Sequence, residues 1–149
     1  LDLAAAPGGK STLLSSYLGE EGLLVANEVI ASRAQILKEN VIKWGLGNTV
    51  VTHNDPEHFG PLEGFFDLVL VDAPCSGEGM FRKDPLAREE WSSEHVSLCS
   101  ARQKRIVDKA GELVKGGGYL LYSTCTFNEK ENEDKNRIFF VLFLCKKCL

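Results

Sequence analysis

The sequence lacks both a long apolar run and a broad excess of positive charge. None of its apolar stretches approaches the roughly 20 residues that a membrane-spanning helix needs, so we expect no membrane partner. The formal net charge of -4 leaves no basic field over the whole chain. A nucleic-acid partner would therefore be met by local patches, or by parts of a protein outside this chain.

Cysteine and histidine are also scarce. The five cysteines are odd in number and irregularly spaced, so a disulfide framework is not expected and a reducing, cytoplasmic setting is. The three histidines show no ligand spacing. A zinc site through Cys75, Cys99 and Cys125 would lack close Cys-x-x-Cys pairs, and Cys145-x-x-Cys148 is a single half-site. We expect no metal, and we expect Cys99 to be buried in a helix.

What is present is ordinary material for one globular core. The chain has 149 residues, of which 44% are hydrophobic and 26% are charged. Leu1 is not a methionine, and Ile138 to Leu144 form a dense apolar run that a last strand would explain. We expect a truncated catalytic core over residues 1–134, followed by an atypical tail over residues 135–149.

Short apolar stretches bounded by Gly, Asn, Asp or Pro recur along the chain and predict buried parallel strands. They are the strand tail Leu1–Leu3 and the stretches Leu23–Glu28, Thr49–His53, Phe66–Val71 and Tyr119–Ser123. Apolar residues at helical spacing lie between them, over 34–44 and 106–114. This alternation predicts an α/β fold with a doubly wound, mostly parallel sheet. The one long irregular stretch, Gly77 to His95, is expected to be a loop that faces the substrate.

A glycine-containing loop, Ala4-Ala5-Ala6-Pro7-Gly8-Gly9-Lys10, joins the first predicted strand to the first helix. Two glycines let the backbone approach a ligand closely. Gly9-Lys10-Ser11 matches the end of a nucleotide-triphosphate P-loop, but Ala4 stands where that motif has glycine. Pro7 also removes an N–H group that would bind phosphate. The loop therefore favours a ligand without phosphate groups.

Acidic residues follow successive predicted strands. Glu28 lies 20 positions beyond Gly8, where a carboxylate can bind both hydroxyls of a ribose. Asp55 follows the next strand and is placed to accept a hydrogen bond from an adenine amino group, and Asp72 follows the strand after that. Together with the loop, these acids favour S-adenosylmethionine. Taken singly, each of these acids is more often a helix cap or a solvated loop residue than a ligand-binding one, but their regular recurrence after strands favours a functional role.

Two cysteines follow predicted strands in similar settings, Asp72-Ala73-Pro74-Cys75 and Ser123-Thr124-Cys125-Thr126. Since the carboxyl ends of parallel strands share one edge, both thiols are expected near one pocket. A thiolate that adds to C6 of cytosine makes C5 reactive toward an electrophilic methyl group. The reaction also needs an acid near N3 and a base for the C5 proton, and Cys125, Asp72 and Cys75 can fill these roles. The alternative is that both cysteines fill a core.

Three motifs in order resemble those of the Nop/Sun-type RNA cytosine-C5 methyltransferases, most closely the bacterial ribosomal RNA enzymes. They are the loop from Ala4 to Lys10, Asp72-Ala73-Pro74-Cys75-Ser76-Gly77 and Tyr122-Ser123-Thr124-Cys125-Thr126. The segments 77–83 and Phe127-Asn128-x-x-Glu131-Asn132-Glu133 are similar to that subgroup as well. The resemblance extends over residues 1 to about 134.

The resemblance implies a class I methyltransferase core with a Rossmann-like fold. It implies that S-adenosylmethionine is held by the loop from Ala4 to Lys10 together with Glu28, Asp55 and Asp72. It also implies that Cys125 is the nucleophile, that Cys75 assists release, and that Lys10 lies near the methionine end of the cofactor and the target base. This division of labour separates the family from the DNA cytosine-C5 methyltransferases, whose nucleophile is the Pro-Cys cysteine.

Methyl transfer to C5 of cytidine in RNA, through a covalent adduct between a cysteine and C6, is therefore the expected activity. The expected substrate is ribosomal RNA, with transfer RNA as the second choice, and the expected state is a monomer. Family members carry an N-terminal region that helps to bind RNA, and their sheet normally has seven strands, so this chain is expected to be a truncated form. Two alternatives remain open: a non-catalytic fragment that keeps only the cofactor pocket, and a P-loop-like nucleotide-binding protein.

Overall fold

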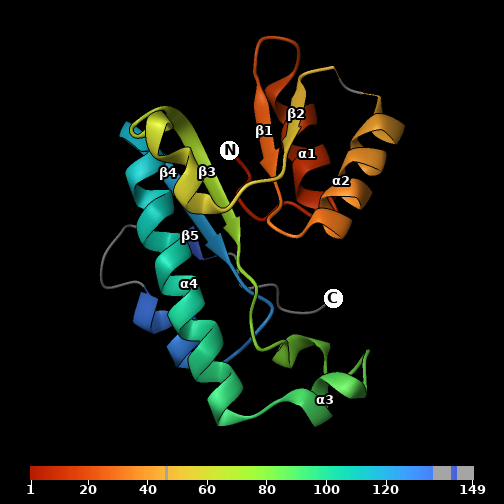
Figure 1. Ribbon diagram of the computed structural model, residues 1–149, viewed down its shortest axis with the longest axis vertical. Helices are drawn as coiled ribbons and strands as arrows, with labels where there is room; N and C mark the ends of the chain where they lie inside the picture. Colours follow the sequence, from red (N-terminus) through yellow and green to blue (C-terminus); the bar gives the residue numbers. More distant parts are fainter. Residues whose placement is uncertain (46, 136–141, 144–149) are drawn as a thin grey trace.

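The sheet is centred on the short segment Leu1–Leu3. In the computed structural model, which describes residues 1–45, 47–135 and 142–143, Asp2 forms parallel bridges to Ala26 on one side and Leu70 on the other. This segment joins a pair of parallel strands to a group of three (Figure 1). The pair is β1 (Leu24–Asn27) and β2 (Thr49–Thr52), and the group is β3 (Phe66–Asp72), β4 (Val114–Ser123) and β5 (Leu142–Phe143). The predicted parallel α/β fold is confirmed.

The order of the strands reverses beside this central segment. The chain adds β1 and then β2 on one side, and afterwards β3, β4 and β5 on the other. In parallel α/β sheets the ligand crevice lies outside the carboxyl ends of the strands at such a reversal. The glycine-containing loop and the end of β3 both lie there.

Helices cover both faces of the sheet. The longer ones are α1 (Gly9–Leu18), α2 (Ala31–Trp44) and α4 (Ser93–Leu113), and the short ones are η1 (Pro56–Leu62), η2 (Glu78–Met80), α3 (Leu86–Glu90), η3 (Glu129–Glu131) and η4 (Glu133–Lys135). Side chains alternate between faces along a strand, and Val69 and Val71 pack in one cluster with Ile106 and Val107 of α4. Leu70, between them, faces Leu14 of α1 across a cavity. Therefore α4 and α1 lie on opposite faces.

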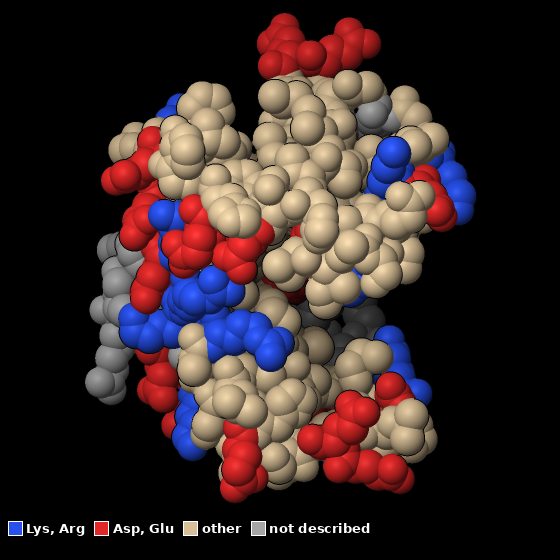
Figure 2. Space-filling view, viewed as in Figure 1, with Lys and Arg blue, Asp and Glu red and all other residues tan. Residues whose placement is uncertain are grey.

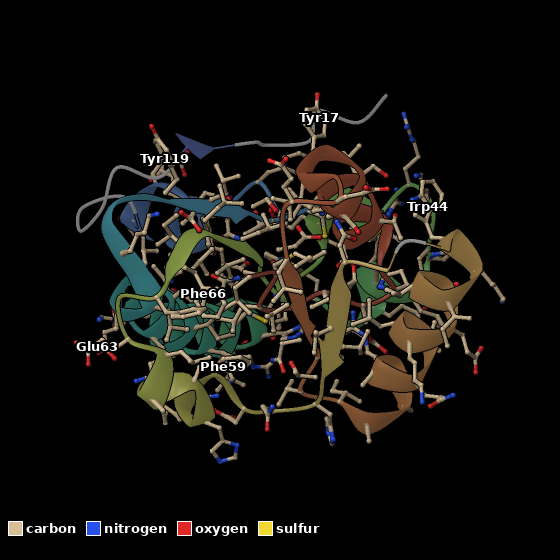
Figure 3. All side chains as sticks on the ribbon, turned by 90° about the horizontal axis from the view of Figure 1, so that it is seen from above. Tyr17, Trp44, Phe59, Glu63, Phe66 and Tyr119 are labelled. Atoms are coloured by element: carbon tan, nitrogen blue, oxygen red, sulfur yellow. The ribbon has the colours of Figure 1, made fainter. Side chains whose placement is uncertain are left out.

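The larger core cluster lies between β3, β4 and α4. Phe59 of η1 and Phe66 of β3 both belong to it, and Figure 3 shows them side by side next to α4. A smaller cluster packs Ala5 and Ala6 of the loop with Leu24 of β1 and Leu37 of α2. Since the loop contributes side chains to this second cluster, packing fixes its position relative to the sheet.

The structure differs from the sequence-based expectation in two places. The stretch from Gly77 to His95 is not one irregular loop, because it contains η2, α3 and the start of α4. The α4 helix begins early since Ser92 caps it, its Oγ accepting a hydrogen bond from the His95 backbone N–H at 3.0 Å. The second difference concerns β4, which begins at Val114 and not at the predicted Tyr119. Its residues Gly116–Gly118 lie where the pairing with β3 is irregular.

Two further expectations concern the tail and the membrane. Of the apolar run from Ile138 to Leu144, only β5 is described, and it pairs in parallel with β4; the Cys145-x-x-Cys148 half-site lies outside the described residues. Among the helices in the part of the chain that the structure describes, none combines the length and apolar character needed to cross a membrane.

Candidate active site

The register between β3 and β4 brings the two cysteine motifs together. Asp72 at the end of β3 lies opposite Ser123 at the end of β4, and the Ala73 N–H donates to the Ser123 carbonyl oxygen at 2.8 Å. Beyond these residues both chains leave the sheet at the same edge. The sulfur atoms of Cys75 and Cys125 come to lie 3.2 Å apart.

The contact between the two thiols shifts their pKa values in opposite directions. It lowers the pKa of Cys125 to about 7, although burial and the Asp72 carboxylate act in the opposite direction. The same hydrogen bond, together with burial, raises the pKa of Cys75. Cys125 is exposed and Cys75 is half-buried. Near neutral pH, Cys125 therefore supplies the thiolate while Cys75 remains a thiol that donates to it.

Asp72 is held between two donors beside the cysteines. The Lys10 ammonium group, in the first turn of α1, pairs with its Oδ2 atom. The Ser123 Oγ donates to its Oδ1 atom at 2.6 Å. These contacts fix an anion and a cation next to Cys125.

The loop before α1 has a backbone shape that only glycine accepts readily. Gly8, which precedes α1, has a φ of 114°, and a Cβ atom added there would lie 3.1 Å from Leu37 of α2. Two loop carbonyl oxygens accept hydrogen bonds from α2: Ala6 from Arg33 at 2.8 Å and Pro7 from Asn40 at 2.7 Å. The loop is therefore preorganised before any ligand arrives.

A cavity of about 750 Å³ opens between this loop, α1 and the ends of β3 and β4. Lys10, Asp72 and Cys125 border it together with apolar side chains and small loop residues. Those neighbours are Ala4, Ala5, Ala6, Pro7, Gly9, Leu13, Leu14, Leu70, Leu121, Tyr122, Ser123 and Thr124. Its reactive groups thus stand beside an apolar wall.

Asp2 also borders this cavity, from the central segment of the sheet. Its side chain is fully buried, and the Ser11 Oγ donates to its Oδ2 atom at 2.6 Å. Within residues 1–45 and 47–135, no hydrogen-bond partner is found for its Oδ1 atom. Burial raises the pKa of Asp2 to about 6. An unmatched acceptor at the cavity wall suits a ligand with a positive charge or a donor group.

Glu28 and Asp55 stand apart from this cavity, and each has a basic partner of its own. The buried Glu28 carboxylate accepts from the Ile30 N–H at 3.0 Å and lies 3.6 Å from the Arg33 guanidinium. Asp55 accepts from two nitrogens of Arg105 on α4, at 3.0 and 3.3 Å. The Arg105 guanidinium lowers the pKa of Asp55. Neither carboxylate lines the cavity that holds Lys10, Asp72 and Cys125.

The segment after Cys75 folds directly onto the Cys125 loop. The Gly79 N–H donates to the Cys125 carbonyl oxygen at 2.7 Å, and a Cβ atom at position 79 would lie 2.3 Å from that oxygen. Glu78 accepts from the Phe127 N–H at 2.7 Å. Only glycine permits this approach at position 79, so this segment and the Cys125 loop are fixed to each other.

Sequence reasoning gave no role to a group of polar residues behind the two cysteine loops, namely Ser76, Gln103, Asn128 and Glu131. Their contacts centre on the Glu131 carboxylate, which is fully buried. Ser76, Asn128 and Glu131 lie in segments that resemble the family, but the spacing Asn128-x-x-Glu131 is typical of a helix N-terminus with an exposed glutamate. Asn128 does cap η3 by accepting from the Glu131 N–H at 3.0 Å, but the spacing does not show where the carboxylate points.

Comparisons with known proteins agree with these motifs. A family model described as 16S rRNA methyltransferase RsmB/F matches residues 1–141. Ribosomal RNA small subunit methyltransferase F of Pectobacterium atrosepticum is 47% identical over 134 residues, which cover 89% of this chain and 28% of that protein. The protein of the same name from Salmonella paratyphi A is also 47% identical, over 90% of this chain and 28% of its own length.

Solved structures share the fold. PH0851 superposes with a TM-score of 0.83 at 37% identity, over 90% of this chain and 31% of that one. NSun6 from Pyrococcus horikoshii with SFG gives a TM-score of 0.76 at 30% identity, over 89% of this chain and 34% of that one. The arrangement around the central segment, Rossmann-like in its parallel strands, is therefore common to these proteins.

Proposed function

This chain belongs to the RsmB/F family of 16S rRNA methyltransferases, and we propose that it is the catalytic core of an enzyme that methylates C5 of a cytidine in ribosomal RNA. The chain spans 28% of the length of the curated relatives that it matches. The proposal therefore concerns the intact protein, in which residues 1–134 would form the core.

The contact between Cys75 and Cys125 is the observation that carries the proposal. A thiolate at Cys125 and a thiol at Cys75, 3.2 Å apart beside a cavity, suit a reaction in which one sulfur attacks and the other assists release. The opposite pKa shifts support giving the attack to Cys125. A pair of core-filling cysteines would not need an exposed member beside Lys10 and Asp72.

The residues then act in sequence. The Cys125 thiolate adds to C6 of the cytosine, and a proton donated to N3 from the Lys10–Asp72 pair neutralises the negative charge that the ring gains; this proton returns to the pair when the ring is restored. Carbon C5 gains the methyl group and afterwards loses its proton, and the bond between sulfur and C6 breaks to restore the ring. The base must leave its stack to reach the pocket.

A change in the pKa of Cys75 during the reaction explains why release follows attack. The two contributions from Cys125 that raise this pKa are the hydrogen bond between the sulfur atoms and the charge of the thiolate. Once the Cys125 sulfur is bound to C6, neither cause remains, so Cys75 becomes more acidic. It can then lose its proton to solvent and, as a thiolate, accept the proton from C5, which is what release requires.

The cavity suits S-adenosylmethionine as the methyl donor. The unmatched Oδ1 atom of Asp2 and the neighbouring Asp72 favour a positively charged ligand. Gly8 and Gly9, in the loop from Ala4 to Lys10, leave room for the cofactor to lie against the loop backbone. Glu28 would bind the ribose, and Asp55 the adenine, at the far side of the loop. The cofactor would supply an electrophilic methyl group, and SFG, present in the related NSun6 structure, is an analogue of it.

The RNA must be bound largely by local contacts. Figure 2 shows lysine and arginine side chains gathered over α4. Most of them are already paired: Lys104 with Asp108, Arg105 with Asp55, and Lys109 with Glu112. A helix whose cations are neutralised in this way offers little to phosphates, so the intact protein must add RNA-binding surface of its own.

The buried side chain of Ser11 speaks against a P-loop nucleotide site. In such a site the serine hydroxyl after the lysine binds a magnesium ion. Here the Ser11 side chain is fully buried and donates to Asp2 at 2.6 Å, while Lys10 pairs with Asp72. Neither group is free for a triphosphate.

Methyl transfer by the intact protein to unmodified small-subunit ribosomal RNA tests the proposal. Labelled methyl groups should appear on C5 of a cytidine. Cofactor binding without transfer would favour the non-catalytic alternative, and magnesium-dependent ATP binding would revive the P-loop alternative.

A further inference from the structure

The Glu131 carboxylate is buried without a cation. Its exposure is 0%, and the ion pairs formed by residues 1–45 and 47–134 do not include it. Four neutral donors bind it instead. Its Oε1 accepts from the Ser76 N–H at 3.0 Å and from Gln103 at 2.7 Å, and its Oε2 accepts from the Ser76 hydroxyl and from Asn128 at 2.6 Å. Burial of a charge is costly unless such bonds compensate it.

Ser76 and Asn128 belong to the segments that carry the two sulfur atoms, and Gln103 reaches them from α4. Ser76 follows Cys75, and Gln103 also donates to the carbonyl oxygen of Pro74, which precedes Cys75, at 3.1 Å. Thr126 follows Cys125 and is 3.0 Å from the Ser76 hydroxyl. The carboxylate is thus the common acceptor behind both loops.

The same contacts exclude an acid or base role for Glu131. Each of its carboxylate oxygens already accepts two hydrogen bonds, and the side chain is not exposed to the cavity. It can therefore act only through its neighbours. The backbone of η3 is held separately, since the Tyr122 hydroxyl donates to the Glu131 carbonyl oxygen at 2.8 Å.

We propose that the Glu131 carboxylate is a positioning group that sets the separation of the Cys75 and Cys125 sulfur atoms and thereby the rate of product release. This inference rests on the proposed function for its consequence but not for its geometry. The Cys75 side is tied to the carboxylate through Ser76 and Gln103. The Cys125 side is tied to it through Asn128 and Thr126, and in addition lies on the same short stretch of chain as Glu131, whose backbone the Tyr122 hydroxyl holds separately. Loss of the carboxylate should therefore displace Cys75 more than Cys125, and slow release more than attack.

Glu131→Gln tests the inference. The glutamine amide keeps the volume of the side chain but points its own N–H groups at those of Asn128, so that two donors face each other without an acceptor. Glu133→Gln is the matched control, since Glu133 is an exposed glutamate two residues further on. The first measurement uses no RNA. Hydrogen peroxide takes two electrons and two protons from the two thiols, forming one S–S bond and two waters, so the rate of disulfide formation in the intact protein reports how closely the sulfur atoms are held.

We expect a Cys75–Cys125 disulfide to form readily in the wild type and in Glu133→Gln. In Glu131→Gln it should form at least about tenfold more slowly, because small misplacements of reacting groups have large effects on rate. Circular dichroism should show that the variant is folded. Equal rates in the wild type and in folded Glu131→Gln would overturn the inference.

The second measurement follows the covalent adduct with unmodified small-subunit ribosomal RNA. Glu131→Gln should accumulate adduct, whereas the rate at which the adduct first forms should change by less than about threefold. A purely structural loss would lower both rates together. If the wild type transfers no methyl group at all, the proposed function fails, while the peroxide rates still decide the role of Glu131.

Ser76→Ala keeps the test decisive if Glu131→Gln does not fold. It removes the hydroxyl bonds to Glu131, Thr126 and Asn128 and leaves the backbone bond to Glu131 in place. Disulfide formation should slow several-fold. A folded Ser76→Ala variant that forms the disulfide at the wild-type rate would contradict the inference.

Discussion

The carboxyl edge of the sheet has two parts that are organised differently. After β3 and β4, the functional groups bind one another: Lys10 pairs with Asp72, and Cys75 contacts Cys125. We refer to these four residues as the cysteine edge. After β1 and β2, Glu28 and Asp55 each pair with an arginine that has no place in the chemistry; we refer to these two acids as the carboxylate edge.

Under the proposed function, this difference separates the residues of the reaction from those that bind the cofactor. Groups that are coupled to one another, as at the cysteine edge, alter each other's acidity and affect the chemical step. Groups held by independent ion pairs, as at the carboxylate edge, can exchange a hydrogen bond with a ligand and affect its affinity. Changes at the cysteine edge should therefore lower kcat, and changes at the carboxylate edge should raise the KM for the cofactor.

The largest effect is expected at Cys125. Cys125→Ala should lower methyl transfer by about 10⁴-fold or more, because no other group replaces the attacking sulfur. Incorporation of labelled methyl groups into ribosomal RNA measures this loss. Cys99→Ala is the matched control, since Cys99 is a buried cysteine of α4 that does not line the cavity. If Cys125→Ala still transferred methyl groups at the wild-type rate, the nucleophile would be another residue.

Asp72 should have the next largest effect. Asp72→Asn should lower kcat by about 100-fold, the size expected for loss of a positioned acid–base group, and should also raise the KM for the cofactor, because Asp72 borders the cavity proposed for it. Steady-state kinetics at saturating RNA measure both constants. Asp67→Asn is the control, because Asp67 is an acid on the same strand that pairs with Lys115 on the surface. A rise in KM without loss of kcat would assign Asp72 to the carboxylate edge.

The pH dependence of Cys125 alkylation tests the coupling of the two thiols. The thiolate reacts with iodoacetamide, so the rate should rise with pH and reach half of its maximum near pH 7, the pKa given to Cys125 by its contact with Cys75. In Cys75→Ala the donor is lost, and the midpoint should move up toward the ordinary thiol value of about 8.5. At pH 7 this shift makes alkylation about fifteenfold slower. An unchanged midpoint would show that the thiols titrate independently.

The carboxylate edge should show the smallest effects. Glu28→Gln and Asp55→Asn should each raise the KM for S-adenosylmethionine by about tenfold, as expected for a lost hydrogen bond to a charged group, with kcat within about twofold. Glu57→Gln is the control, because Glu57 is an exposed neighbour of Asp55. A fall in kcat at either position would erase the distinction between the two edges.

Much of the fold followed from the sequence because buried parallel strands and glycine punctuation are local signals. The pattern around Phe66–Val71 and Tyr119–Ser123 predicted two strands, and the structure has β3 and β4 there. That placement alone predicted Cys75 and Cys125 at one edge, which the register of Asp72 opposite Ser123 brings together. The early start of α4 was not predicted, since the cap at Ser92 lies among polar residues with no helical periodicity.

The support around the site could not be predicted, because it depends on contacts between distant segments. Glu131 is 55 residues from Ser76, and only the fold reveals that its carboxylate is buried against that residue. The pairing of Asp55 with Arg105 spans 50 residues in the same way. Composition and spacing indicate which residues carry the chemistry, but not which ones hold them in place.

The position of the covalent adduct is the most direct test of the division of labour between the two cysteines. Intact Cys75→Ala protein should be incubated with unmodified small-subunit ribosomal RNA and S-adenosylmethionine, digested, and analysed by mass spectrometry for a cysteine bound to a methylated cytidine. We expect the adduct to accumulate, with the nucleotide attached to Cys125. An adduct on any other residue, or rapid turnover without a trapped adduct, would contradict the assignment of attack to Cys125 and release to Cys75.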